Sequence, residues 1–305
     1  MIITEGYMPF LGYHTYYRVV GSIEESLARG LAPLVCLHGG PGSTHDYMEL
    51  LDPLAKSGRA LVMYDQLGCG RSPVTGHPEL WVAKTWVEEL AALREHLHLT
   101  SVHLLGQSWG GMLAITYLCD CSTRGVRSVI LSSTLSDSQL WGREQHRQIG
   151  LMDQADQAAI REAEATGDYH SEAFLTAVAH FMTRHCAGQY GPDSPECLTR
   201  PRQTGRESYE VAWGPNEFTP LGTLKDWCYT ERLRDIRVPA LIVSGTNDLC
   251  TPLIAKTMAD RIPDSRWELF EGCRHMCFAE DTPRYLAMTE RWLRGHDLAQ
   301  AKEAR

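Results

Sequence analysis

The sequence contains no apolar run near the roughly 18 residues that a membrane-spanning helix needs. It has no dense basic cluster, and its 305 residues carry a formal net charge of −9. Since nucleic-acid binding requires local positive charge, that class of partner is excluded. The absence of fixed-period repeats and low-complexity stretches also excludes solenoids and disordered chains. We expect a soluble globular protein without membrane or nucleic-acid partners.

An export signal is also missing. The opening stretch, MIITEGYMPFLGYHTYY, has no basic segment followed by an apolar core, because Glu5 and Gly6 interrupt it. The ten cysteines lie in dissimilar contexts, several inside apolar runs, which favours reduced and buried thiols over disulfides. Both observations predict a cytoplasmic protein. The sequence leaves the oligomeric state open.

What is present is a regular alternation of strand and helix patterns. The first 20 residues alternate apolar and polar residues and predict an antiparallel hairpin. Six short apolar runs predict buried parallel strands: Pro33–Leu37, Ala60–Tyr64, Val102–Leu105, Arg127–Leu131, Ala240–Ser244 and Arg266–Phe270. Four segments between them have helical periodicity: Val82–His96, Gly110–Cys119, Pro252–Arg261 and Pro283–Leu293. The alternation predicts an α/β fold with a mostly parallel central sheet and helices on both faces.

Between residues 137 and 231 the apolar strand runs stop, and only helical segments and loops follow. We therefore predict a helical cap at 137–231, inserted between a first core segment, 1–136, and a second, 232–305. The length of 305 residues exceeds one average domain, and the insertion accounts for the excess.

The most informative motif is GQSWG at the junction of a predicted strand and a predicted helix. It matches the GxSxG nucleophile elbow, in which Gly106 and Gly110 leave space around a projecting Ser108. The five-residue pattern alone is common and fits any tight turn. Its position between strand and helix favours a catalytic serine.

A serine hydroxyl needs a base to remove its proton and an acid to orient that base. Asp248 follows the run ALIVSG, and His275 follows WELF, so both come after predicted strands in the order that the elbow requires. The competing acids fit less well: Asp235 precedes its strand, while Asp260 and Asp264 belong to a helix and its turn. We therefore predict the triad Ser108, Asp248 and His275.

The segment HGGPG, residues 38–42, follows a predicted strand and has the composition of an oxyanion loop. Pro41 has no N–H, so the predicted donors are the backbone N–H groups of Gly40 and Trp109, with Gly39 as the alternative. A phosphate-binding loop fits poorly, because neither GxGxxG nor the Lys-Ser/Thr of a P-loop is present.

Cys273 and Cys277 bracket His275 and raise the alternative of a metal site. No second cluster supplies a fourth ligand, and metal binding would take His275 away from Ser108. The reaction that the triad performs requires no cofactor, so we predict neither a metal nor an organic cofactor.

HGGPG at 38–42, YDQLGCGRS at 64–72, GQSWGG at 106–111, WGPNEF at 213–218 and SGTNDLCTP at 244–252 occur together. In these motifs, which span nearly the whole chain, the sequence resembles the proline iminopeptidase family of α/β-hydrolases. The resemblance implies an α/β-hydrolase fold with a cap and a prolyl aminopeptidase activity. The implied substrates are short peptides or aminoacyl amides with a free N-terminus.

Glu217, in WGPNEF, matches a family glutamate that binds the substrate ammonium group. Some relatives have a second such glutamate directly after the triad aspartate, where this chain has Leu249. Glu207 or Glu210 is a potential replacement. Tyr209 and Trp213 are predicted to contact the substrate, and the further cap aromatics Phe181, Phe218 and Trp227 are candidates for a proline-sized pocket. The alternative is that these aromatic residues belong to the core, as residues at such spacing more often do.

Alternative functions use the same fold. An amino-acid amidase, carboxylesterase or thioesterase would share the triad, but an ester substrate leaves an acidic cap residue without a use. A binding protein without catalysis is disfavoured by the complete triad. An epoxide hydrolase or dehalogenase would have aspartate in place of Ser108.

Overall fold

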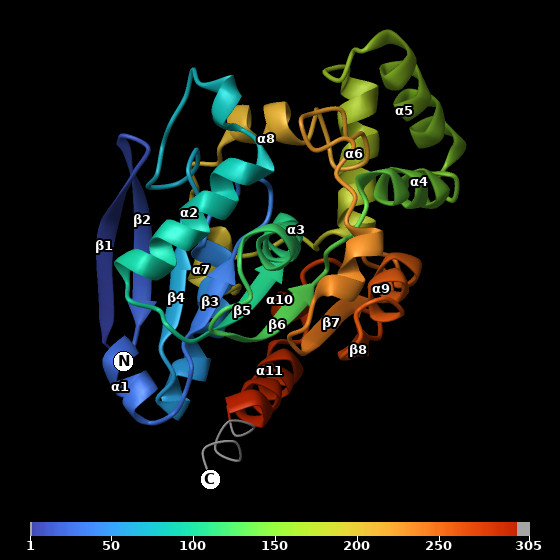
Figure 1. The fold of residues 1–305 in the computed structure, drawn as a ribbon. Helices are drawn as coiled ribbons and strands as arrows, with labels where there is room; N and C mark the ends of the chain where they lie inside the picture. The colour runs from blue at the N-terminus through green and yellow to red at the C-terminus, as the bar shows by residue number, and fades with distance from the viewer. Residues whose placement is uncertain (1, 298–305) are drawn as a thin grey trace.

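The computed structural model describes residues 2–297. Its centre is one eight-stranded sheet with the order β1-β2-β4-β3-β5-β6-β7-β8 (Figure 1). The strands are β1 (Ile3–Phe10), β2 (Tyr13–Val20), β3 (Leu34–Leu37), β4 (Leu61–Tyr64), β5 (Val102–Gln107), β6 (Val126–Ser132), β7 (Ala240–Gly245) and β8 (Ser265–Phe270). The β1–β2 hairpin is antiparallel and pairs antiparallel with β4, whereas all pairs from β4 to β8 are parallel. The predicted hairpin and mostly parallel sheet are confirmed.

The helices alternate with the strands. On the core they are α1 (Ile23–Ala28), α2 (Ala83–His96), α3 (Trp109–Thr116), α9 (Pro252–Ala259), α10 (Cys277–Glu280) and α11 (Thr282–Asp297). Shorter or tighter helical segments are η1 (Asp46–Ser57), η2 (Pro78–Leu80), η3 (Tyr117–Cys121) and η4 (Thr230–Asp235). The helix expected over Gly110–Cys119 thus consists of α3 and the π-helical turn η3.

Both faces of the sheet are covered, and alternate residues of one strand enter different cores. In β3, Val35 and Leu37 pack in a cluster with side chains of α2, α3 and α9. Leu34 and Cys36 point the other way, into a cluster with η1 and α11. Because both faces of β3 are buried, all four of its residues are apolar.

One strand differs from its prediction. β8 is paired on one side only and lies at the edge of the sheet, and its residues are mostly half-buried or exposed. Leu269 is an exposed apolar side chain of this strand. The apolar run therefore correctly predicted a parallel strand, but the prediction of full burial was wrong because an edge strand has a free side.

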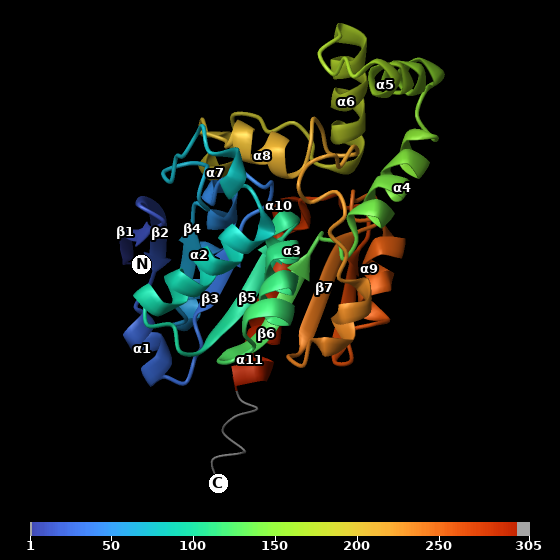
Figure 2. The same cartoon turned by 45° about the horizontal axis from the view of Figure 1, so that its top comes forward.

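Five α-helices, followed by η4, lie between the end of β6 at Ser132 and the start of β7 at Ala240. They are α4 (Ser138–Ile149), α5 (Gln154–Thr166), α6 (Glu172–His185), α7 (Glu196–Thr199) and α8 (Arg206–Ala212). Helices α5 and α6 extend beyond the sheet, on the side opposite the end of α11 (Figures 1 and 2). The division at residues 136 and 231 remains a prediction.

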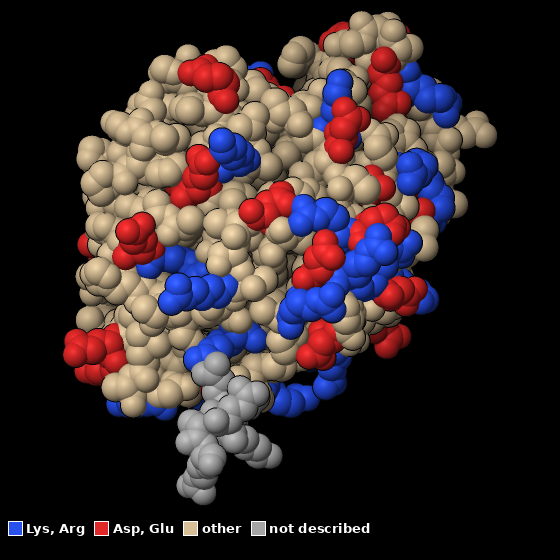
Figure 3. Space-filling view, in the orientation of Figure 1, with Lys and Arg blue, Asp and Glu red and all other residues tan. Residues whose placement is uncertain are grey.

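Charged side chains of both signs are interspersed on the face shown in Figure 3, with no separate basic patch there. Among residues 2–297, no helix combines the length and the apolar character needed to cross a membrane.

Candidate active site

Ser108 lies in the turn that joins β5 to α3. Its backbone has φ 55° and ψ −123°, a left-handed conformation that costs a non-glycine residue about 1–3 kcal/mol. Surrounding bonds hold it there, since Ser108 N–H donates to the Ser132 carbonyl at 3.0 Å and Thr134 Oγ1 donates to the Ser108 carbonyl at 2.6 Å. The turn is therefore a strained feature that its neighbours impose.

The two elbow glycines are required by close backbone contacts. A Cβ atom on Gly106 would overlap the carbonyl group of Gly110, and one on Gly110 would overlap the carbonyl of Leu37. These contacts confirm the steric reason predicted for the glycines. They also bring the first turn of α3 against the end of β3, which places the serine beside the loop that follows β3.

Asp248 and His275 follow the ends of β7 and β8 and meet in space. His275 Nδ1 lies 2.7 Å from Asp248 Oδ1, and both side chains are buried. Two backbone groups donate to the Asp248 carboxylate, Cys250 N–H at 2.8 Å and Gly245 N–H at 3.2 Å. Asp248 is thereby held in one orientation, with Oδ1 facing the imidazole.

A cavity of about 410 Å³ brings the predicted residues together. Ser108, His275, Tyr209 and Glu217 line it, as does Leu249. No hydrogen bond joins Ser108 Oγ to His275 within the described residues. The cavity thus contains a serine, a histidine oriented by aspartate, and a carboxylate supplied by the cap segment.

The loop after β3 forms another side of the cavity, and Gly39, Gly40 and Gly42 all line it. Gly39 N–H donates to Tyr47 Oη at 2.6 Å, so this alternative oxyanion donor is already engaged. The N–H groups of Gly40 and Trp109 have no hydrogen-bond partner within residues 2–297. These two groups remain the candidate donors to an oxyanion.

Glu217 is anchored in the cap by its neighbours. Tyr209 Oη donates to Glu217 Oε1 at 2.9 Å, and Trp141 Nε1 donates to the Glu217 carbonyl at 2.7 Å. Trp141 also packs edge-on against His275, with ring centroids 6.1 Å apart. Burial raises the pKa of Glu217, while the hydrogen bond from Tyr209 and the nearby His275 act in the opposite direction.

Trp213 does not take its predicted place beside the substrate, and the other cap aromatics follow the alternative of a core position. Trp213 is not among the residues that line the cavity; it packs edge-on against Trp141 at 6.2 Å, in the core. Phe181, Phe218 and Trp227 are likewise buried core residues. Of the predicted aromatic contacts, only Tyr209 reaches the cavity, because the helical cap needs apolar side chains for its own packing.

The two acids considered as replacements for the missing second glutamate also lie elsewhere. Glu207 accepts hydrogen bonds from Gly76 N–H and from Trp81 Nε1, and Glu210 pairs with Arg206 at 2.6 Å. Neither lines the catalytic cavity. Of the acids considered at the sequence level, only Glu217 lies in this cavity.

Two buried residues on the loop side were missed by the sequence interpretation. Tyr47 lines the cavity, accepts from Gly39 N–H and donates to Gln107 Oε1 at 2.8 Å. Gln107 occupies the variable position of GxSxG, and Tyr47 lies in a helical pattern. Through these two hydrogen bonds Tyr47 connects the loop after β3 to the elbow. No sequence pattern at either position predicts this connection.

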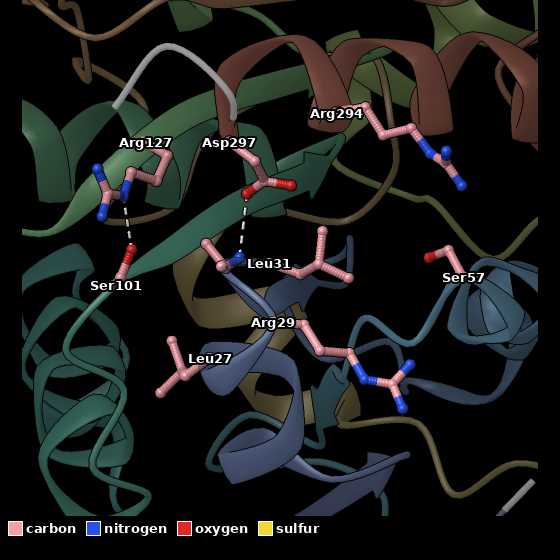
Figure 4. Close-up of a pocket in the computed structure, with 10 residues that line it drawn as sticks. Leu27, Arg29, Leu31, Ser57, Ser101, Arg127, Arg294 and Asp297 are labelled. Carbon is pink, nitrogen blue, oxygen red and sulfur yellow. Dashed lines mark hydrogen bonds between the residues drawn. The ribbon is translucent and has the colours of Figure 1, made fainter. Parts of the chain in front are cut away.

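A second cavity, of about 550 Å³, lies at the other end of the sheet (Figure 4). Its lining includes Arg29, Arg127, Arg294 and Asp297, but no histidine. It therefore lacks a base for serine chemistry, and the smaller cavity around Ser108 is the candidate active site.

Residues 32–282 match the model of the α/β hydrolase fold family. This match covers most of the chain, and the elbow and the mostly parallel sheet have the expected arrangement. The protein is an α/β-hydrolase, as predicted.

More specific similarity comes from individual proteins. The chain is 55% identical over 297 residues to the proline iminopeptidase of Clostridium botulinum, a match that covers 97% of this chain and 100% of that protein. The crystal structure of VinJ has a TM-score of 0.86 at 32% identity and covers 96% of this chain and 99% of VinJ. The proline iminopeptidase of Mycobacterium smegmatis has a TM-score of 0.85 at 30% identity and covers 97% of this chain and 100% of its own. The chain belongs to the proline iminopeptidase family.

Proposed function

We propose that this protein is a serine aminopeptidase that releases an N-terminal residue, preferentially proline, from short peptides. The observation that carries the proposal is the carboxylate of Glu217 in the same cavity as Ser108 and His275. A free N-terminus is an ammonium group, and a partly desolvated carboxylate is a strong acceptor for it. The family membership supports the same assignment.

The first half of the reaction forms an aminoacyl-serine. Because His275 Nδ1 faces Asp248, this nitrogen carries the proton and Nε2 acts as the base for Ser108. Ser108 Oγ attacks the first peptide carbonyl, and the N–H groups of Gly40 and Trp109 stabilise the oxyanion. The imidazolium then protonates the leaving amine.

The second half uses the same residues on water. His275 deprotonates a water molecule, which attacks the aminoacyl ester, and the proton returns to Ser108 Oγ as the amino acid leaves. Asp248 stabilises the imidazolium in both halves and does not itself become protonated. No step needs a metal or an organic cofactor.

Glu217 determines which peptide bond of the substrate is cleaved. Its carboxylate holds the ammonium group, so only the first peptide carbonyl reaches Ser108. The hydrogen bond from Tyr209 Oη keeps the carboxylate oriented toward the cavity. Burial raises the pKa of Glu217 and so favours its neutral form. An ammonium group that binds beside the carboxylate favours the ionised form instead, so the substrate is bound most strongly when Glu217 is deprotonated.

The deciding experiment compares Glu217→Gln with the wild type on a prolyl arylamide and on a neutral ester of similar size. Loss of a charged hydrogen-bond acceptor is expected to lower kcat/KM for the arylamide by about 10- to 100-fold. Turnover of the ester, which has no ammonium group, is expected to change by less than about threefold. Equal losses on both substrates would exclude the ammonium-binding role and favour an esterase.

The same cavity would also accept an aminoacyl amide, so an amino-acid amidase is the alternative within this mechanism. A panel of aminoacyl arylamides and aminoacyl amides that differ in the first residue separates the two. Highest kcat/KM on the prolyl arylamide supports the aminopeptidase, and a preference for simple amides of other residues supports the amidase.

A further inference from the structure

The catalytic cavity also contains a cation that the proposed mechanism does not use. Arg202, in the segment that joins α7 to α8, lines the cavity together with Ser108 and His275. Its guanidinium donates to the Leu198 carbonyl at 2.9 Å and lies 5.8 Å from the ring centroid of Tyr47. A guanidinium has five N–H donors, so most of them remain available.

Arg202 differs from the arginines around it in having no acidic partner. Arg200 pairs with Asp46 at 3.0 Å and with Glu49 at 2.9 Å, and Arg206 pairs with Glu210. For Arg202, no ion pair occurs within residues 2–297. A half-buried guanidinium that lines a cavity and has no carboxylate partner of its own is expected to attract an anionic group.

The segment that carries Arg202 is fixed at both ends. On one side, Arg200 is held by its ion pairs to η1. On the other, Gly205 N–H donates to the Gly42 carbonyl at 2.7 Å, and the Gln203 carbonyl accepts from Gly70 N–H at 2.7 Å. Arg202 is therefore held beside the oxyanion loop, and a ligand that binds it meets a preorganised donor.

Glu217, Arg202 and Arg206 all line the cavity. Arg206 is paired with Glu210, whereas Glu217 and Arg202 have no ion pair within residues 2–297 and lie beside different walls. Glu217 is fixed through Trp141 and Tyr209, whereas Arg202 stands over Tyr47, which is bonded to the oxyanion loop. A short peptide has the complementary charges: an ammonium group at one end and a carboxylate at the other. On the Tyr47 side, Gln107 also lines the cavity, and its buried Nε2 has no hydrogen-bond partner within the described residues.

We propose that Arg202 binds the C-terminal carboxylate of the substrate and thereby selects very short peptides with a free carboxyl group. This inference rests on the proposed function. Glu217 binds the amine end, Ser108 attacks the bond between the two anchors, and Arg202 holds the leaving part. Each residue added to the peptide moves its C-terminal carboxylate up to about 3.5 Å further from the ammonium group. Because Glu217 and Arg202 are fixed in place, only a peptide of matching length can contact both.

The test uses pairs of substrates that differ only in the terminal charge: prolylglycine and prolylglycylglycine, each against its C-terminal amide, with a prolyl arylamide as reference. For the wild type we expect kcat/KM to favour the acid over the amide by about 10-fold or more at one of the two lengths. Arg202→Met is expected to abolish that preference while changing arylamide turnover by less than about threefold.

Two further variants separate binding from a structural role. Arg202→Lys keeps the charge but not the planar fork and is expected to restore part of the preference for the acid. Arg206→Met removes the other guanidinium that lines the cavity, whose charge Glu210 already neutralises, and the preference is expected to persist.

Three results would overturn the inference: equal turnover of acid and amide by the wild type, an equal loss on acid, amide and arylamide in Arg202→Met, or loss of the preference in Arg206→Met alone. Failure of the wild type on the arylamide and on every peptide is distinguishable from these, because it would overturn the proposed aminopeptidase function itself.

Discussion

Buried histidine–aspartate pairs occur at three places within residues 2–297: His275–Asp248, His103–Asp297 and His45–Asp65. The first two lie at opposite ends of the sheet and have different surroundings. His275 and Asp248, joined at 2.7 Å, lie at the carboxyl ends of the strands beside Ser108. His103, at the start of β5, and Asp297, at the end of α11, are joined at 3.0 Å. A histidine–aspartate contact therefore does not by itself identify a catalytic base.

What separates the pairs is the second ring nitrogen and the access to it. His103 Nδ1 is bonded to Ser128 Oγ at 2.8 Å, and its partner Asp297 also binds Arg59. Both nitrogens of His103 are thus engaged, and burial lowers its pKa. His275 uses one nitrogen for Asp248 and lines a cavity, so its other nitrogen is available for proton transfer.

The largest loss of activity is expected when the serine beside His275 is replaced. Ser108→Ala removes the nucleophile, and kcat/KM on a prolyl arylamide should fall by roughly 10⁴-fold or more. The fold should persist, because Ser108 is fixed through its backbone groups. Turnover assays with a thermal melt as control check this; near-wild-type activity would disprove the role of Ser108.

The next largest effect is expected at the aspartate of the catalytic pair. Asp248→Asn disturbs the tautomer of His275, and turnover should fall by roughly 10³- to 10⁴-fold. Asp297→Asn makes the same chemical change in the other pair and should leave kcat/KM within about twofold at a temperature where both variants are folded. Similar losses of activity in both would contradict the distinction drawn between the pairs.

The free energy of unfolding should be more sensitive to the aspartate of the other pair, Asp297. Asp297→Asn leaves the buried Arg59 guanidinium without its counter-charge and should lower the free energy of unfolding by about 3 kcal/mol. As a control, the exposed Asp264→Asn should change it by less than about 0.5 kcal/mol. Urea denaturation measures both, and an unaffected Asp297→Asn would show that this ion pair is not stabilising.

The smallest effect concerns pH. Burial raises the pKa of Asp297, but hydrogen bonds from His103, Arg59 and the Ala32 N–H outweigh it and lower the pKa to about 2. Because the pKa is lower in the folded state than the value of about 3.9 in an unfolded chain, Asp297 contributes about 2 kcal/mol above pH 4. That contribution is lost as the pH falls toward 2.

The difference in unfolding free energy between wild type and Asp297→Asn should therefore narrow between about pH 4 and pH 2. Denaturation at several pH values measures it. A difference that stays constant down to the lowest pH at which the protein folds would contradict the lowered pKa.

Much of the catalytic end could be predicted from sequence because it depends on local patterns. The elbow glycines are dictated by contacts within one turn and with the adjacent strand, and Asp248 and His275 follow strands whose apolar runs are visible. The partial burial of β8 was not predicted, because a run of residues does not reveal which strand forms the edge.

The cap was less predictable. Tyr209 and Trp213 come from the same short aromatic segment, yet Tyr209 reaches the cavity and Trp213 packs in the core. Arg202 has no sequence signal, since it is one of several arginines in a loop. Unlike its neighbours Arg200 and Arg206, it has no ion pair within residues 2–297, and this difference depends on how loops distant in sequence meet.

The sequence by itself determined the strands and helices of the sheet and the family, and it predicted the nucleophile elbow and the order of the triad. Each of these depends on residues near one another in the chain or on motifs that can be identified directly. Tertiary structure decided which of the buried histidine–aspartate pairs shares a cavity with a serine, which cap residues line that cavity, and that Arg202 has no ion pair within residues 2–297 while Arg200 and Arg206 do. These properties depend on burial and on contacts between distant segments, and neither is encoded in any local pattern.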